Sequence, residues 1–254
     1  MVLNYKKYGE QGTVILILHG LLGSLDNWQT IAQQLAAHFQ VYSLDMRNHG
    51  RSPHAPEMSY EVMTQDIVEF CQQQQIGKAT LIGHSMGGKV AMWTALQHPE
   101  IIDKLIVVDI APVRYEGGHE SILFAMAEAP LAVYSSRSEV EQFIAPRIPK
   151  EGVRQFILKN LGRNQDGKFI WKSNLPVLIA TYRVLMDFPV SSAVFQGPAY
   201  FIQGEKSAYI QAENKAKCMA LFPHGEFHSI AGAGHWVHAD QPQAFVETLN
   251  TILR

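Results

Sequence analysis

Cysteine is scarce in this chain: among 254 residues only Cys71 and Cys218 occur. Both fall in segments with a helical pattern, so we expect two buried, reduced thiols rather than a disulfide or a metal pair. Long apolar runs are also missing. No run can span a bilayer, and the start of the chain lacks the apolar stretch and small-residue cleavage site of a signal peptide. The sequence therefore predicts a soluble, cytoplasmic protein.

An excess of charge of either sign is absent as well. The 21 Lys and Arg residues nearly balance the 23 Asp and Glu residues, which leaves a formal net charge of -2. No basic stripe stands out, so we do not expect a nucleic acid partner. A chain of this length can bury most of its apolar surface, either as one large domain or as a domain with an insertion.

Six short apolar runs alternate with helical patterns along most of the chain. The runs cover residues 13–18, 39–45, 79–84, 104–109, 199–204 and 226–232, and the helical patterns cover 25–39, 59–74, 86–98 and 213–222. Runs of this kind are typical of strands that are buried on both faces. The alternation predicts an α/β fold with a mostly parallel central sheet, flanked by helices and joined by right-handed crossovers.

The alternation lapses between about Pro112 and about Gln196, where several amphipathic helices are expected instead. We therefore predict a core domain made of residues 1–111 and 197–254, with a helical cap made of residues 112–196. Helical spacing is typical of packed side chains, so most large apolar residues of the cap should pack it onto the core, and a few could face a substrate. These residues are Phe124, Met126, Tyr134, Phe143, Phe156, Trp171, Tyr182 and Met186.

The pattern G-x-S-x-G occurs at Gly83-His84-Ser85-Met86-Gly87, between a predicted strand and a predicted helix. In this context the pattern is typical of a nucleophilic serine held on a sharp, strained turn. An ordinary turn or a phosphate-binding loop is the alternative, but the spacing fits neither a P-loop nor a dinucleotide fingerprint. The Met86 amide, at the helix N-terminus, can donate to an oxyanion.

A second glycine turn, His19-Gly20-Leu21-Leu22-Gly23, follows the run 13–18. It can supply the other oxyanion donor, and the Leu21 amide is our candidate. Two amides from different loops that converge on one point are what acyl transfer requires.

The serine needs a base, and eleven histidines are available. His235 is our candidate, because it lies on a glycine loop after the last apolar run, late in the chain as the order Ser, Asp, His requires. His238 is expected on the surface, near a helix capped by Asp240. His224 and His228 fall on a predicted strand, about 13 Å apart and too far to share one ion, so we expect no metal site. Trp236, beside the base, is a candidate for substrate binding.

The acid that orients the imidazole has two candidates. Its usual position, three residues past the glycine that ends the next-to-last strand, holds Ser207, which carries no charge. Asp109 ends the run 104–109 on the strand next to the serine turn, and Glu205 directly follows Gly204. We prefer Asp109, because nothing else explains a charge at the end of an apolar strand, whereas Glu205 fits an exposed polar turn.

These segments resemble the YbfF-type esterases and their mitochondrial relatives in the α/β-hydrolase superfamily. The resemblance is carried by HGLLGSLDNW, LDMRNHGRSP with PEMSY, GHSMGGKVAM, IDKLIVVDIAPV and IAGAGHWVHADQP. It implies the α/β-hydrolase fold, with a helical cap inserted after the strand that the family counts as its sixth. It also implies Ser85 as nucleophile, Asp109 as acid, His235 as base, and the Leu21 and Met86 amides as oxyanion donors.

The resemblance implies short-chain esters as substrates, with acyl-CoA thioesters as a further class, and no cofactor. Arg47 and His49 of DMRNHG look like loop organisers; contact with an acidic part of the substrate is the alternative for them. Two other functions remain open: a carbon-carbon bond hydrolase or lyase with the same triad, and a catalytically silent binding module. The oligomeric state cannot be predicted.

Overall fold

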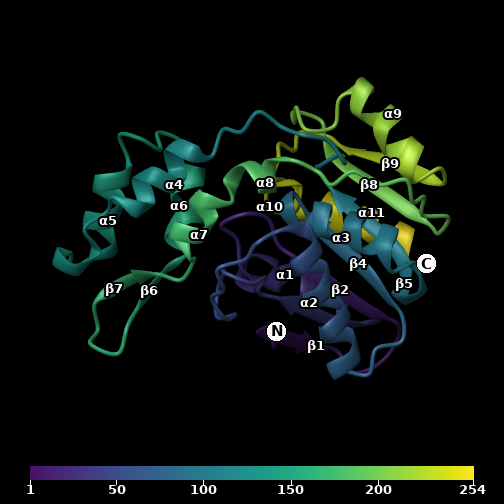
Figure 1. The fold of residues 1–254 in the computed structure, drawn as a ribbon, viewed down its shortest axis with the longest axis horizontal. Coiled ribbons are helices and arrows are strands. Elements are labelled where there is room, and N and C mark those ends of the chain that lie inside the picture. Colours follow the sequence, from purple (N-terminus) through teal and green to yellow (C-terminus); the bar gives the residue numbers. More distant parts are fainter.

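A seven-stranded sheet forms the centre of the computed structural model, which describes residues 1–254 (Figure 1). Its strand order is β1-β3-β2-β4-β5-β8-β9. Neighbouring strands run parallel, except that β1 pairs antiparallel with β3 at one edge. The strands are β1 (Tyr5–Tyr8), β2 (Val14–Leu18), β3 (Gln40–Leu44), β4 (Ala79–His84), β5 (Ile102–Val108), β8 (Ala199–Gly204) and β9 (Gly225–Ile230).

All six predicted strands are present, which confirms the mostly parallel α/β architecture. Their ends differ from the predicted ones by two residues at most. Strand β1 was not predicted from the sequence: its residues Tyr5–Tyr8 include two lysines and are mostly exposed. An edge strand of this kind needs no apolar run, because only its pairing with β3 fixes its place.

Helices cover both faces of the sheet. The helices of the core are α1 (Gln29–Leu35), α2 (Tyr60–Gln73), α3 (Met86–Gln97), α9 (Ala212–Leu221), α10 (Val237–Asp240) and α11 (Pro242–Leu253), and short 3₁₀ turns occur at Leu25–Trp28, Pro99–Ile101 and Leu131–Val133. Apolar side chains of α1 and α11 pack with Ile15 and Ile17 of β2 on one face. Side chains of α2, α3 and α9 pack with Leu16 and Leu18 on the other. This alternation follows from the two-residue period of a strand.

The chain leaves the sheet after β5 and returns to it at β8. The strand that the family counts as its sixth is β5 here. The intervening elements are α4 (Glu120–Ala127), α5 (Arg137–Ile144), α6 (Glu151–Leu158), β6 (Leu161–Arg163), β7 (Phe169–Trp171), α7 (Leu175–Ala180) and α8 (Tyr182–Met186). Figure 1 shows α4 to α7 and the β6–β7 hairpin gathered on one side of the molecule, at the left of the view. We propose residues 112–196 as the cap domain.

The β6–β7 hairpin was not predicted, because we expected only helices in the cap. Its turn depends on Asn164, whose side-chain oxygen accepts hydrogen bonds from the amides of Asp166 and Lys168. Gly167 completes the turn with a φ of 76°. A side chain that mimics a backbone turn in this way, followed by glycine, is a hairpin signal, and helical spacing does not reveal it.

None of the helices has both the length and the apolar character needed to cross a membrane. Cys71 and Cys218 are buried free thiols on α2 and α9, as the sequence predicts.

Candidate active site

Ser85 lies on the sharp turn between β4 and α3, with φ 52° and ψ -117°. A Cβ atom at Gly83 would lie 2.2 Å from the Gly87 carbonyl oxygen, and one at Gly87 would lie 2.3 Å from the Leu18 carbonyl oxygen. Glycine is therefore required at both positions by the close approach of strand and helix. The strained backbone at Ser85 lifts the hydroxyl away from the sheet edge.

The loop after β2 packs directly against this turn. A Cβ atom at Gly20 would lie 2.9 Å from His84 Nδ1 and 3.2 Å from Ser85 Cβ. Leu21 and Met86 line the same cavity as Ser85. Met86 is the first residue of α3, so its amide has no acceptor within the helix. The structure thus brings together the two predicted oxyanion donors and the candidate nucleophile.

Two buried histidines hold the Leu21 loop in place. His49 Nε2 accepts a hydrogen bond from the Leu22 amide at 3.1 Å, and His49 Nδ1 donates to the Arg47 carbonyl. His19 Nε2 accepts from the Met46 amide, and His19 Nδ1 donates to the Gly20 carbonyl. Burial lowers the pKa of His19 to about 4 and that of His49 to about 3. Both rings are therefore neutral at pH 7, and each acts once as donor and once as acceptor.

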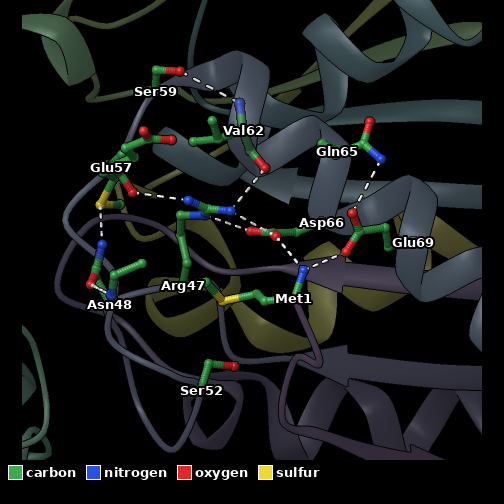
Figure 2. Close-up of polar contacts among 12 residues, drawn as sticks. Met1, Arg47, Asn48, Ser52, Glu57, Ser59, Val62, Gln65, Asp66 and Glu69 are labelled. Atoms are coloured by element: carbon green, nitrogen blue, oxygen red, sulfur yellow. Dashed lines mark hydrogen bonds and ion pairs between the residues drawn. The ribbon is translucent and has the colours of Figure 1, made fainter.

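Arg47 organises the neighbouring loop, as Figure 2 shows. Its guanidinium donates two hydrogen bonds to the Asp66 carboxylate, at 2.6 and 2.8 Å, and others to the carbonyls of Glu57 and Val62. The residue is only 8% exposed. The structure thus supports loop organisation for Arg47 and His49 over contact with an acidic substrate, since their polar atoms are used within the protein.

Lowering the pH from 7 to 5 is expected to destabilise the fold through His19 and His49. In the unfolded chain these residues take up protons near a pKa of about 6.5, whereas burial holds their folded pKa at about 4 and about 3. Their contribution to stability is complete above the unfolded pKa and is lost as the pH falls toward the folded one. Each should lose about 2 kcal/mol by pH 5, measured as the change in free energy of unfolding by urea.

Two variants isolate this effect. Because a glutamine amide at position 49 can still accept the Leu22 hydrogen bond without titrating, His49→Gln should lose about 2 kcal/mol less than the wild type between pH 7 and 5. His38 is exposed, so His38→Gln should behave like the wild type. An unchanged pH dependence in His49→Gln would show that His49 is not held neutral in the folded state.

The candidate base and the preferred acid are in contact. His235 Nδ1 lies 2.8 Å from Asp109 Oδ2. Asp109 is fully buried, and its other oxygen accepts the Gly204 amide at 3.0 Å. The Ser207 hydroxyl also donates to Asp109 Oδ2. Ser207, which stands where the acid was first expected, thus donates a hydrogen bond to Asp109, the candidate acid that follows β5.

Glu205, the alternative acid, points elsewhere. It is exposed, and its carboxylate accepts the Gly232 amide at 2.7 Å. No hydrogen bond joins it to His235. The contacts of the imidazole therefore favour Asp109.

The serine turn contacts the loop that carries the candidate base, but no hydrogen bond joins Ser85 to His235. His84, which precedes Ser85, donates from Nε2 to the His235 carbonyl at 2.9 Å, and the two imidazole rings lie 4.7 Å apart. The Tyr209 ring stacks on the His235 ring, with centroids 4.0 Å apart. The hydrogen bond between His235 and Asp109 is therefore formed, and the one between Ser85 and His235 is not. Catalytic hydrogen bonds of this kind often form only when substrate binds.

The cavity at Ser85 has a volume of about 20 Å³, room for about one water molecule. Its lining combines the oxyanion loop, α3 and the cap, and consists of Leu21, Ser85, Met86, Lys89, Ile110, Tyr115, His119, Leu185, Met186 and Tyr209. Any substrate must therefore displace side chains of the lining. A small acyl group requires the least displacement.

Lys89 was not predicted as a site residue from the sequence. It lies on α3 one turn after Ser85, is only 2% exposed, and donates from Nζ to the carbonyls of Met186 and Asp187 at 2.9 and 2.7 Å. Burial lowers its pKa to about 7. The signal was a lysine in an otherwise apolar helix. Its contacts join the nucleophile helix to the end of the cap.

Trp236 lies beside the base but outside the cavity of Ser85. Its ring packs on Phe156 of α6, at 5.4 Å, and lines a separate pocket of about 240 Å³ between the cap and the core. Of the large apolar cap residues, Met186 lines the Ser85 cavity, while the Trp171 indole donates to the Met126 carbonyl within the cap. The role of Trp236 in substrate binding stays a prediction.

The expectation of a surface position for His238 is wrong. The residue is 7% exposed, and its ring stacks on Trp28 at 4.1 Å. Asp240 does not cap the last helix either. It ends α10 and accepts the Gly234 amide at 2.8 Å, and Gln241 precedes Pro242 as the N-cap of α11. The short helix α10 lies between His235 and α11 and turns His238 inward. The sequence had indicated only one helix in this region.

Several known proteins share the sequence and the fold of this chain. A family model described as "alpha/beta hydrolase fold" matches residues 13–129. Esterase YbfF of Escherichia coli is 40% identical over 94% of this chain and 92% of its own length. The sn-1-specific diacylglycerol lipase ABHD11 of Danio rerio is 37% identical over 99% of this chain and 82% of its own. A solved structure named "Marine microorganism esterase" superposes with a TM-score of 0.96 at 40% identity and covers 98% of each chain.

Proposed function

Because the chain belongs to the YbfF-type esterases of the α/β-hydrolase superfamily, we propose that Ser85, His235 and Asp109 are the triad with which it hydrolyses carboxylic esters. The protein is a serine ester hydrolase. The assignment of the triad is carried by one observation above all, the 2.8 Å contact between His235 Nδ1 and the buried Asp109 carboxylate beside the serine turn. This contact fixes the tautomer that leaves His235 Nε2 able to accept a proton.

In the first half of the reaction Ser85 Oγ forms a bond to the ester carbonyl carbon, and its proton passes to His235 Nε2. The carbonyl oxygen becomes an oxyanion, which accepts hydrogen bonds from the Leu21 and Met86 amides. The bond to the leaving oxygen then breaks, and His235 returns the proton to the departing alcohol. Asp109 stabilises the imidazolium throughout this half.

In the second half water takes the place of the alcohol. His235 accepts a proton from water, whose oxygen bonds to the acyl carbon, and the bond to Ser85 breaks as the proton returns to Oγ. The acid product leaves and the serine is regenerated. These steps need no cofactor.

We infer that short acyl groups are the preferred substrates, because the Ser85 cavity of about 20 Å³ leaves little room. Thioesters, including acyl-CoA, fall within the same chemistry, since a thiol can replace the alcohol as leaving group. A cytoplasmic location stays a prediction from the sequence.

The substrate class is tested by rates of hydrolysis. Wild-type protein is expected to cleave p-nitrophenyl acetate and butyrate with a higher kcat/KM than a vinylogous diketone, the substrate type of a carbon-carbon bond hydrolase. The diketone should react slowly, because the cavity at Ser85 is small. A preference for the diketone would assign the triad to carbon-carbon bond cleavage instead.

A further inference from the structure

His119 brings an imidazole from the start of the cap into the cavity that holds Ser85. It precedes α4 and is half-buried. Its Nδ1 faces the Tyr182 hydroxyl at 3.3 Å. Tyr182 does not line the cavity, whereas His119 does. Because Nδ1 is engaged by Tyr182, Nε2 is the ring nitrogen that remains available to the cavity.

The hydrogen bonds of Tyr182 favour one tautomer of His119. The Tyr182 oxygen accepts the His119 amide at 2.9 Å, and the phenol proton, which has no other acceptor within the protein, is available to donate to Nδ1. An imidazole that accepts at Nδ1 and is neutral carries its proton on Nε2. Nε2 makes no hydrogen bond within the protein. It is therefore an N–H donor without a partner.

Burial keeps this ring neutral. Burial, and as a lesser cause the nearby His235, lower the pKa of His119 to about 4. At pH 7 the ring is thus a neutral donor, which suits a neutral oxygen acceptor better than an anion.

The other polar side chains of the cavity are largely occupied. Lys89 donates to two carbonyls of the cap, and the Tyr115 hydroxyl donates to the Tyr209 carbonyl and accepts the Ala111 amide. Besides Ser85 and His119, Tyr209 is the lining residue with an unpaired polar side-chain group, its hydroxyl. His235, which must protonate the leaving group, does not line this cavity. The cavity therefore holds the acyl side of the substrate.

From this geometry, and on the basis of the esterase function proposed above, we propose that His119 is a specificity-determining residue. Its Nε2–H binds a neutral oxygen, of an ether, hydroxyl or carbonyl group, in a short acyl chain. The enzyme should thus prefer oxygen-bearing acyl groups over plain alkyl groups of the same size. Once the acyl chain has displaced water from the cavity, the Nε2–H donor has a partner with an oxygen-bearing acyl group and stays unpaired with a plain alkyl group.

The test compares p-nitrophenyl methoxyacetate with p-nitrophenyl butyrate, which differ by one oxygen in place of a methylene. The ratio of their kcat/KM values, divided by the ratio of their hydroxide rates, measures selectivity free of intrinsic reactivity. His119→Leu should lower this corrected ratio about fivefold, as expected for one neutral hydrogen bond. His119→Gln, similar in size to leucine and with an amide donor, should keep most of it. Tyr209→Phe removes the other unpaired hydroxyl and should leave the ratio unchanged.

Each outcome decides the proposal. A ratio that is unchanged in His119→Leu, or equal losses with both esters, would show that His119 only packs the cap. If Tyr209→Phe lowers the corrected ratio and His119→Leu does not, the hydrogen bond to the acyl oxygen comes from Tyr209. If the wild type cleaves neither ester, the esterase function itself fails, and this proposal with it.

Discussion

Replacing Ser85 by alanine is expected to lower kcat for p-nitrophenyl butyrate by about 10⁶-fold, because no other group on the serine turn can form the acyl-enzyme. The Ser85 hydroxyl makes no hydrogen bond within the protein, so its removal should leave the fold intact. Steady-state kinetics measure the loss, and a thermal melt compared with the wild type checks the fold. Residual activity within about a hundredfold of the wild type would mean that a different nucleophile acts.

The second large effect is expected for Asp109→Asn, with a loss in kcat of about 10⁴-fold. An asparagine amide presents its NH₂ group to His235 Nδ1 and so favours the wrong imidazole tautomer. The shape of the side chain stays the same, and its carbonyl oxygen can still accept one of the hydrogen bonds from Gly204 and Ser207. The loss should therefore fall on kcat rather than on KM.

Glu205→Gln is the matched control for the acid. Glu205 is exposed, and a glutamine oxygen can still accept the Gly232 amide. This variant should keep kcat within about threefold of the wild type, the effect of a small surface change. If it is more damaging than Asp109→Asn, the acid has been assigned to the wrong carboxylate.

The central sheet could be predicted because its strands are buried on both faces, which makes them short, apolar and distinct from the helices between them. β1 lacked this signal because it is an exposed edge strand with two lysines. The β6–β7 hairpin was missed because one side chain, Asn164, sets its turn. Local composition thus predicts elements that the core stabilises, and it fails where one hydrogen bond or one edge contact decides the structure.

The residues of the candidate site also differ in how far the sequence could predict them. Ser85, His235 and Asp109 could be proposed from sequence because each follows a strand at the same edge of a parallel sheet. His238 was misplaced because the short helix α10 turns it onto Trp28, and no spacing rule indicates such a turn. The roles of Lys89 and His119 depend on partners far along the chain. Lys89 contacts cap carbonyls about 100 residues away, and His119 contacts Tyr182 about 60 residues away. Contacts of that range are invisible in a local pattern.

The most direct test of the account is to locate the covalent adduct of a fluorophosphonate ester by peptide mass spectrometry. Wild-type protein should take up one phosphonyl group, on the peptide that contains Ser85, and Ser85→Ala should take up none. A wild type that stays unlabelled, or a label on another residue, would contradict a nucleophilic Ser85 and with it the proposed mechanism.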